Sequence, residues 1–158
     1  MIFKSDMKTD SENRLGSGLV AAKRRILLIE DEPAVSMMMA HVLTRAGCRV
    51  VTAWDAAKGM ALAQTGDFDL ITLDVDLPGM SGFEICRRIK DDVRSRHTPV
   101  VFVSGRASEK DSRHGLELGA VDYITKPFEA TDFIFRIISH ARVKTCATTV
   151  LMRMEAIA

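Results

Sequence analysis

The sequence predicts an α/β fold in which one parallel sheet of five strands has helices on both faces. Five short apolar runs alternate with segments in which apolar residues recur every three or four positions. Ile26–Ile29 and Val100–Val103 contain no polar residue and Leu70–Leu73 contains only Thr72, which is typical of strands that are buried on both faces. The chain has 158 residues, 47% hydrophobic and 27% charged, which suffices for one ordinary globular domain but not for two.

The first strand and helix are expected within residues 25–47. The run Ile26–Ile29 is continuous and apolar and stops at the acids Glu30 and Asp31. Pro33 suits the first turn of a helix, and Gly47 suits the position just after its C-terminal end. Five apolar residues at helical spacing predict the face that is turned to the core: Val35, Met38, Val42, Leu43 and Ala46.

Residues 49–91 repeat this alternation twice. Arg49–Ala53 is rich in β-branched residues and predicts a strand, and Asp55 is a good N-cap for a helix that extends to about residue 64. The apolar run Leu70–Leu73 predicts a third strand, which stops at Asp74. A turn-rich stretch follows. Three apolar residues then predict the inward face of the next helix: Phe83, Cys86 and Ile89.

The last two strand and helix pairs cover residues 100–141. Val100–Val103 predicts a fourth strand that ends at Ser104, and a helix is expected over about residues 108–118. Val121–Thr125 predicts the fifth strand, which leads directly into Lys126. The last helix is expected to begin near residue 131. Its inward face is predicted by five apolar residues: Phe133, Ile134, Ile137, Ile138 and Ala141.

Four of the five predicted strands end at residues that can bind an ion or a phosphate. Glu30 and Asp31 follow the first strand, and Asp74 follows the third. Ser104 ends the fourth strand and Lys126 follows the fifth. Open parallel sheets bind ligands in the crevice beyond the carboxyl ends of their strands. The sequence therefore predicts a single site with three carboxylates, a hydroxyl and an ammonium group.

Three carboxylates held close together repel one another unless a cation compensates their charge. All-oxygen ligands suit a hard ion, and Mg²⁺ fits best because it binds one or two carboxylates beside phosphate oxygens and water. Lys126 and the Ser104 hydroxyl are then natural partners for the remaining oxygens of a phosphoryl group. One of the carboxylates can serve as the nucleophile.

Composition argues against several other functions. The formal net charge is +1, so no direct binding of nucleic acid or of a membrane surface is expected. Neither a GxGxxG motif nor a P-loop follows the first strand. The three cysteines are far apart and odd in number, which predicts reduced thiols. No signal peptide and no membrane span is recognisable, and a cytoplasmic location is expected.

Four ordered motifs resemble the receiver domain of bacterial two-component response regulators. They are the stretches Ile29–Pro33, Leu73–Gly82, Val103–Gly105 and Tyr123–Phe128. The resemblance covers about residues 24–144 and implies a flavodoxin-like (CheY-like), doubly wound sheet with the strand order 2-1-3-4-5. Residues 1–22 are polar and are expected to form a flexible N-terminal segment. Residues 145–158 are expected to be a C-terminal extension or a linker.

The resemblance implies that Asp74 accepts a phosphoryl group from a sensor histidine kinase or a histidine phosphotransfer protein. It implies that Mg²⁺ is held by Glu30, Asp31, Asp74 and the backbone carbonyl of Asp76. Lys126 would pair with the phosphoryl oxygens. The chain would then be a phosphoacceptor signalling domain that catalyses only its own phosphorylation and dephosphorylation, and not an enzyme acting on other substrates.

The same resemblance implies a conformational switch. Ser104 would move toward the phosphoryl group while Tyr123 turns inward. The surface formed by the fourth helix, the fifth strand and the fifth helix would change with them. A downstream effector protein or domain would read this surface, or two copies would form a homodimer through it. The Lys126–Pro127 peptide bond would be cis.

Two charged residues are expected at the rim of the site. Asp76 lies two residues after Asp74, and Arg106 lies two residues after Ser104. We predict that they form an ion pair across the opening and control the access of water to the aspartyl phosphate. The alternative is a pair of solvated charges with little mutual energy.

Two other functions stay open at this point. A pseudo-receiver would be a binding module with the same fold and no phosphorylation, although every required side-chain type is present. The stretch Asp74–Asp76 also resembles the nucleophile motif of haloacid-dehalogenase-like phosphohydrolases. In those enzymes the acid pair follows the lysine, whereas Glu30 and Asp31 precede Lys126 here.

Overall fold

The computed structural model describes residues 22–142 as five strands that alternate with five helices. The elements are β1 Arg25–Ile29, α1 Pro33–Arg45, β2 Arg49–Ala53, α2 Ala56–Ala63, β3 Leu70–Leu73, α3 Gly82–Asp91, β4 Val100–Ser104, α4 Glu109–Glu117, β5 Asp122–Thr125 and α5 Ala130–His140. Every predicted strand and helix is present. Apart from Ala22, the predicted flexible segment 1–22 lies outside the described residues, as does the predicted extension 145–158.

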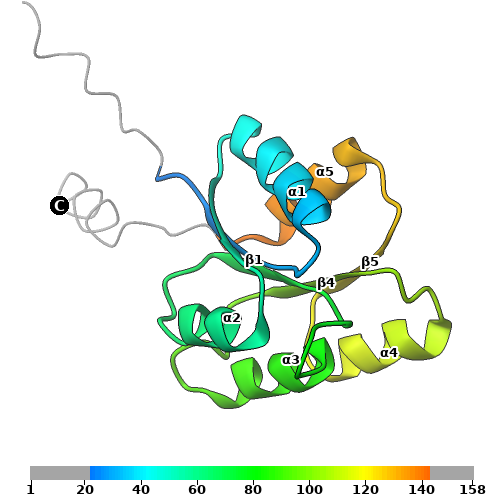
Figure 1. Ribbon diagram of the computed structural model, residues 1–158. Helices are drawn as coiled ribbons and strands as arrows, with labels where there is room; N and C mark the ends of the chain where they lie inside the picture. Colours follow the sequence, from blue (N-terminus) through cyan, green and yellow to red (C-terminus); the bar gives the residue numbers. More distant parts are fainter. Residues whose placement is uncertain (1–21, 143–158) are drawn as a thin grey trace, which may run out of the picture.

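All five strands are parallel and follow the order β2-β1-β3-β4-β5, as predicted. Figure 1 shows α1 and α5 on one face of the sheet and α2, α3 and α4 on the other. The register pairs Ile29 of β1 with Ala53 of β2 and with Leu73 of β3. Because the strands are parallel, all of their carboxyl ends meet at one edge of the sheet, where the residues that follow them converge.

Alternate residues of the strands enter two apolar cores. One core lies against α2, α3 and α4 and contains Leu27, Ile29, Ile71, Leu73 and Phe102 from the sheet. The other lies against α1 and α5 and contains Ile26, Leu28, Leu70, Val101 and Val103. Full burial of one such side chain contributes about 1.5–3 kcal/mol to folding. The unbroken apolar runs are therefore buried on both faces, which explains why they show no alternation of apolar and polar residues.

The predicted inward face of α1 is confirmed for Leu43, which is buried, and for Val35 and Val42, which pack against the same core, but it is wrong for Met38 and Ala46. Met38 is 41% exposed, whereas Met39 is 1% exposed and packs in the core with Leu43. Ala46, also expected inside, is exposed. A run of three methionines lets the apolar period fit either of two helix rotations.

The prediction for the last helix is confirmed. Phe133, Ile137 and Ala141 are buried, and Ile134 and Ile138 pack at the margin of the same core. The only difference lies at the start, because α5 begins at residue 130. α5 thus fixes the far side of β5 and the loop that carries Lys126.

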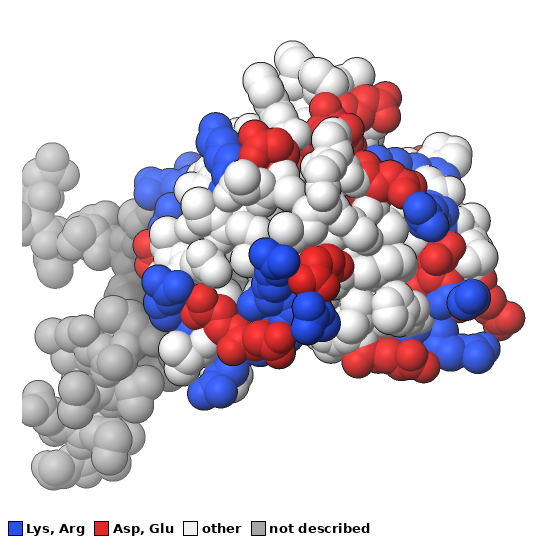
Figure 2. All heavy atoms as spheres, turned by 60° about the horizontal axis from the view of Figure 1, so that its bottom comes forward, with Lys and Arg blue, Asp and Glu red and all other residues white. Residues whose placement is uncertain are grey.

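The charges on the described surface in Figure 2 are mixed, and the two described cysteines are reduced, as the composition predicts. On the face that carries α2, α3 and α4, Figure 2 shows basic and acidic side chains in small, interspersed groups. Cys48 and Cys86 are free and buried, and burial raises the pKa of the Cys86 thiol to about 11. Cys146 lies outside the described residues. Among residues 22–142, no helix is both long and apolar enough to cross a membrane.

Candidate functional site

Three carboxylates meet at the carboxyl edge of the sheet, at the ends of the neighbouring strands β1 and β3. Each of Glu30, Asp31 and Asp74 offers one oxygen, and these oxygens all lie within 4.8 Å of one another. Glu30 is 1% exposed and Asp74 is 7% exposed, while Asp31 is half-buried. The residues that the sequence analysis grouped as acidic ligands are therefore brought together.

Lys126 joins the two most buried carboxylates. Its Nζ donates to Glu30 Oε2 at 2.6 Å and to Asp74 Oδ2 at 2.9 Å. Burial alone would lower the pKa of Lys126, but the hydrogen bonds to Glu30 and Asp74 raise it above its usual value. The ammonium group is therefore fully charged at neutral pH and partly compensates the carboxylates.

The backbone at the end of β5 places Lys126 at this point. Its N–H donates to the carbonyl oxygen of Ser104 at 2.8 Å, which extends the pairing of β4 with β5. The next peptide bond, Lys126–Pro127, is cis, as expected. The side chain then reaches across the end of β4 to the acids that follow β1 and β3.

The donor set fits a small, hard cation. All the side-chain donors in the cluster are carboxylate oxygens, which is the ligand type that Mg²⁺ binds. Burial raises the pKa of Glu30, against the opposing effects of Lys126 and of the Glu32 N–H, so a second positive charge beside it would be favourable. The Asp76 N–H donates to Asp74 Oδ1 at 3.1 Å, which places the backbone of Asp76, the fourth expected ligand, next to the cluster.

The two residues expected to act as a switch are both buried. Ser104 is 0% exposed, and its Oγ accepts a hydrogen bond from the Arg106 N–H at 3.2 Å. The Tyr123 ring points inward and is 9% exposed, with its hydroxyl donating to the Arg106 carbonyl at 2.8 Å. Burial raises the pKa of Tyr123, so the phenol is protonated at neutral pH.

The expected ion pair at the rim is present. Arg106 Nη2 lies 2.7 Å from Asp76 Oδ1, and Arg106 Nε donates to the same oxygen at 2.8 Å. The side chains are 50% and 56% exposed. The hydrogen bond from Arg106 lowers the pKa of Asp76, which stays ionised at neutral pH.

Gly82 is a site residue whose role the sequence analysis missed. It opens α3, and its N–H donates to the Val75 carbonyl at 2.8 Å. A Cβ at this position would collide with the carbonyl oxygen of Asp74 and lie 2.8 Å from Val75 Cα. The first turn of α3 therefore packs directly on the backbone that carries Asp74. The position of Gly82 in the turn-rich stretch gave no sign of this contact, because Asp74 is eight residues away.

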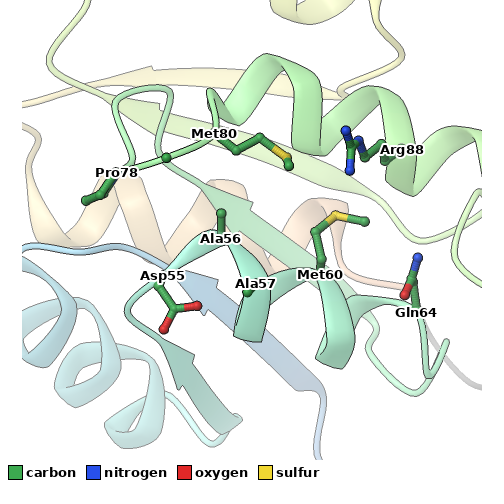
Figure 3. A pocket seen from close by; sticks show the side chains of 9 residues that line it. Asp55, Ala56, Ala57, Met60, Gln64, Pro78, Met80 and Arg88 are labelled. Carbon is green, nitrogen blue, oxygen red and sulfur yellow. The ribbon is translucent and has the colours of Figure 1, made fainter.

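An apolar groove of about 670 Å³ lies between α2, the loop that connects β3 with α3, and Arg88 of α3. Figure 3 shows Met60 and Met80 turned into it from opposite sides, with Arg88 at one end. Arg88 is paired with Glu84 at 2.9 Å. None of the expected phosphoacceptor, metal-binding or switch residues lines the groove.

Comparison with known sequences gives a consistent family match. The profile of the response regulator receiver domain matches residues 26–138. The transcriptional regulatory protein TcrA of Mycobacterium tuberculosis is 40% identical over 119 residues, which are 75% of this chain and 46% of TcrA. The response regulator PleD of Caulobacter vibrioides is 39% identical over 120 residues, which are 76% of this chain and 26% of PleD. The chain thus spans less than half the length of these relatives.

Solved structures show the same arrangement of strands and helices. A CheY-like response regulator receiver domain protein from Methanospirillum hungatei superposes with a TM-score of 0.70 at 29% identity, covering 75% of this chain and 93% of that one. The chemotaxis protein CheY4 of Vibrio cholerae gives a TM-score of 0.70 at 28% identity, covering 77% of this chain and all of CheY4. Both likenesses confirm the CheY-like fold predicted from the sequence.

Proposed function

This chain belongs to the response regulator receiver domain family of two-component systems, and we propose that it accepts a phosphoryl group on Asp74. The donor would be a sensor histidine kinase or a histidine phosphotransfer protein. The observation that carries the proposal is the convergence of Glu30, Asp31, Asp74 and Lys126 at one edge of the sheet. This set contains an acidic nucleophile, two further acids for a cation and an ammonium group for phosphoryl oxygens.

The chemistry follows from the surroundings of Asp74. One of its carboxylate oxygens would attack the phosphorus, and the phosphorus–nitrogen bond of the donor histidine would break as the new phosphorus–oxygen bond forms. The bonding pair leaves on the imidazole nitrogen. Lys126, which already contacts Asp74 Oδ2, would bind a phosphoryl oxygen, and the Ser104 hydroxyl would bind another. Mg²⁺ held by Glu30, Asp31, Asp74 and the backbone carbonyl of Asp76 would neutralise charge on the transferring group.

The output surface is the second part of the proposal. Tyr123 lies in β5, between α4 and α5, so a change at Ser104 and Tyr123 would alter the surface built from these three elements. A downstream effector protein or domain would bind this surface, or two copies would pair through it. The greater length of TcrA and PleD is consistent with a receiver that acts through a further domain. We place this activity in the cytoplasm, where histidine kinases would present the phosphoryl group.

The phosphoacceptor assignment predicts a Mg²⁺-dependent adduct. The chain is incubated with acetyl phosphate and Mg²⁺, and intact mass spectrometry is expected to show one added phosphoryl group. Asp74→Asn should abolish the adduct because the amide is a poor nucleophile, whereas Asp67→Asn, at an exposed aspartate, should leave it unchanged. An adduct that persists in Asp74→Asn would refute the assignment. A folded parent chain that forms no adduct would identify a pseudo-receiver.

The ion pair of Asp76 and Arg106 at the rim is expected to slow the hydrolysis of the aspartyl phosphate in the parent chain. Asp76 and Arg106 close one side of the opening, so Asp76→Asn or Arg106→Ala should shorten the aspartyl phosphate half-life by about two- to fivefold, the range of an exposed ion pair. The half-lives are measured by intact mass after removal of the phosphodonor. Lys110→Ala, at an exposed site on α4, serves as the matched charge control. Equal half-lives in all four chains would exclude the rim pair from the control of water access.

A further inference from the structure

Arg106 makes contacts in three directions from a loop that is otherwise open to solvent. Residues 105–110, which connect β4 with the first turn of α4, are all exposed. Gly105 precedes Arg106, and no atom lies within 4 Å of where its Cβ would be. The position of this loop therefore depends on a small number of specific contacts and not on burial.

The three contacts of Arg106 connect the loop to three strands. Its N–H donates to Ser104 Oγ at the end of β4, at 3.2 Å. Its carbonyl accepts from the Tyr123 hydroxyl of β5, at 2.8 Å. Its guanidinium lies 2.7 Å from Asp76 Oδ1, just beyond β3. The backbone of Arg106 thus forms hydrogen bonds with the hydroxyls of both expected switch residues, while its side chain forms an ion pair with Asp76 on the opposite side of the opening.

The inward place of the Tyr123 ring is tightly bounded. The Phe102 ring lies 5.8 Å away, centroid to centroid. On α4, a Cβ at Gly115 would lie 2.8 Å from Phe102 and 3.3 Å from Tyr123. The absence of a side chain at residue 115 therefore leaves room for both the Phe102 and the Tyr123 ring. The Arg106 carbonyl accepts a hydrogen bond from the Tyr123 hydroxyl, beside the Ser104 hydroxyl, so the position of that carbonyl affects how well the inward hydroxyl is partnered.

We propose that Arg106 is a positioning residue for Tyr123: its ion pair with Asp76 fixes the loop so that its own carbonyl holds the Tyr123 hydroxyl inward. The interpretation of Tyr123 as a signalling residue rests on the proposed function, but the geometric coupling does not. Asp76 is thereby connected to the surface of α4, β5 and α5 without contacting any of these elements. The rim charge would set how strongly that surface favours one arrangement.

The expected size of the coupling follows from the exposure of the ion pair. Both side chains are about half exposed, and exposed ion pairs change a two-state equilibrium by up to about fivefold. Loss of either charge should therefore lower the ratio of inward to outward Tyr123 by about two- to fivefold. This change is too small to unfold the domain and large enough to move a population-weighted spectroscopic signal.

A single fluorine label can test the coupling, because Tyr123 is the only tyrosine of the chain. The chain is labelled with 3-fluorotyrosine, and the ¹⁹F chemical shift is recorded without any phosphodonor. Arg106→Ala and Asp76→Asn should both move the signal toward that of the unfolded chain, and Arg106→Lys should restore part of the shift. Arg113→Ala, which removes an exposed charge from α4, should leave the signal in place.

Two further variants separate this proposal from the phosphoacceptor proposal. The effect of Arg106→Ala should be the same in a chain that also carries Asp74→Asn, since it needs no phosphoryl group. Gly115→Ala places a methyl group 2.8 Å from Phe102 and 3.3 Å from Tyr123, and so gives a reference signal for a Tyr123 ring whose packing is disturbed; thermal unfolding monitored by circular dichroism checks that this variant is folded. If the signal is unchanged in both Arg106→Ala and Asp76→Asn, the positioning role is wrong, whatever the outcome of the adduct experiment.

Discussion

Replacing Lys126 with methionine should lower the free energy of unfolding by about 3 kcal/mol in the absence of divalent cations. Methionine keeps most of the length and the apolar character of the lysine stem, so the main loss is the ammonium group with its charge. Glu30 and Asp74 would then stay nearly buried with no ammonium between them, although Lys126 now contacts both within 3 Å. Loss of one partner from a buried ion pair is among the most destabilising substitutions because the remaining charge is uncompensated.

The same variant should respond more strongly to Mg²⁺ than the parent chain does. In the parent, Lys126 Nζ takes up one oxygen of Glu30 and one of Asp74, so a cation must share these carboxylates with it. Without the ammonium group, Mg²⁺ should bind more tightly and restore a larger part of the stability, since ligand binding to the folded state raises the free energy of unfolding. Phosphorylation by acetyl phosphate should nevertheless fall, because the phosphoryl oxygens lose a partner.

Urea unfolding with and without MgCl₂ measures both effects, and calorimetric titration measures the affinity for Mg²⁺. Lys110→Met is the matched control: it removes an exposed lysine from α4 and should change neither quantity. Equal stability of Lys126→Met and the parent would show that Lys126 does not compensate the cluster. A weaker response to Mg²⁺ in the variant would show that the three carboxylates are not the cation site.

The carboxyl edge of the sheet could be predicted because its signal is local. Four of the five strands end at a residue of the candidate site, and a parallel sheet brings those ends together at one edge. The convergence of Lys126 and Glu30, which are 96 residues apart, could thus be predicted from the strand ends and one topological rule, whereas their direct hydrogen bond was not predicted. Because the strand ends are buried and rigid, the positions of the residues that follow them are narrowly restricted.

The features that could not be predicted depend on the rotation of a helix about its axis or on close contacts with backbone atoms. In α1, three successive methionines are equally apolar, so the sequence did not distinguish Met38, which is exposed, from Met39, which is buried. The hydrogen bond from the Tyr123 hydroxyl to Arg106 uses a backbone carbonyl. Every residue has such a carbonyl, so the type of side chain at position 106 could not predict this bond. The Asp76–Arg106 pair was predictable because both partners carry charge and both flank the same opening.

Gly82→Ala should be the most damaging single-methyl substitution near the site, with a loss of about 2–3 kcal/mol in the free energy of unfolding. The added Cβ would collide with the Asp74 carbonyl oxygen and lie 2.8 Å from Val75 Cα. Both obstacles are backbone atoms at the end of a central strand, so neither can move aside as a side chain could. The greater helix propensity of alanine would offset about 1 kcal/mol or less of the collision.

The collision should also reach the site, because relief requires α3 to move away from β3 or the Asp74 backbone to shift. Either movement would alter the Asp74 carboxylate relative to Glu30 and Lys126, so Gly82→Ala should bind Mg²⁺ less tightly and form less adduct even where it is fully folded. Gly105→Ala is the matched control, since it adds the same methyl beside Ser104 with no atom within 4 Å. The free energy of unfolding in urea, the affinity for Mg²⁺ and the adduct yield are measured for both variants. All three should be close to the parent values in Gly105→Ala and lower in Gly82→Ala. Equal values in the two variants would show that the contact between α3 and the Asp74 backbone does not position the site.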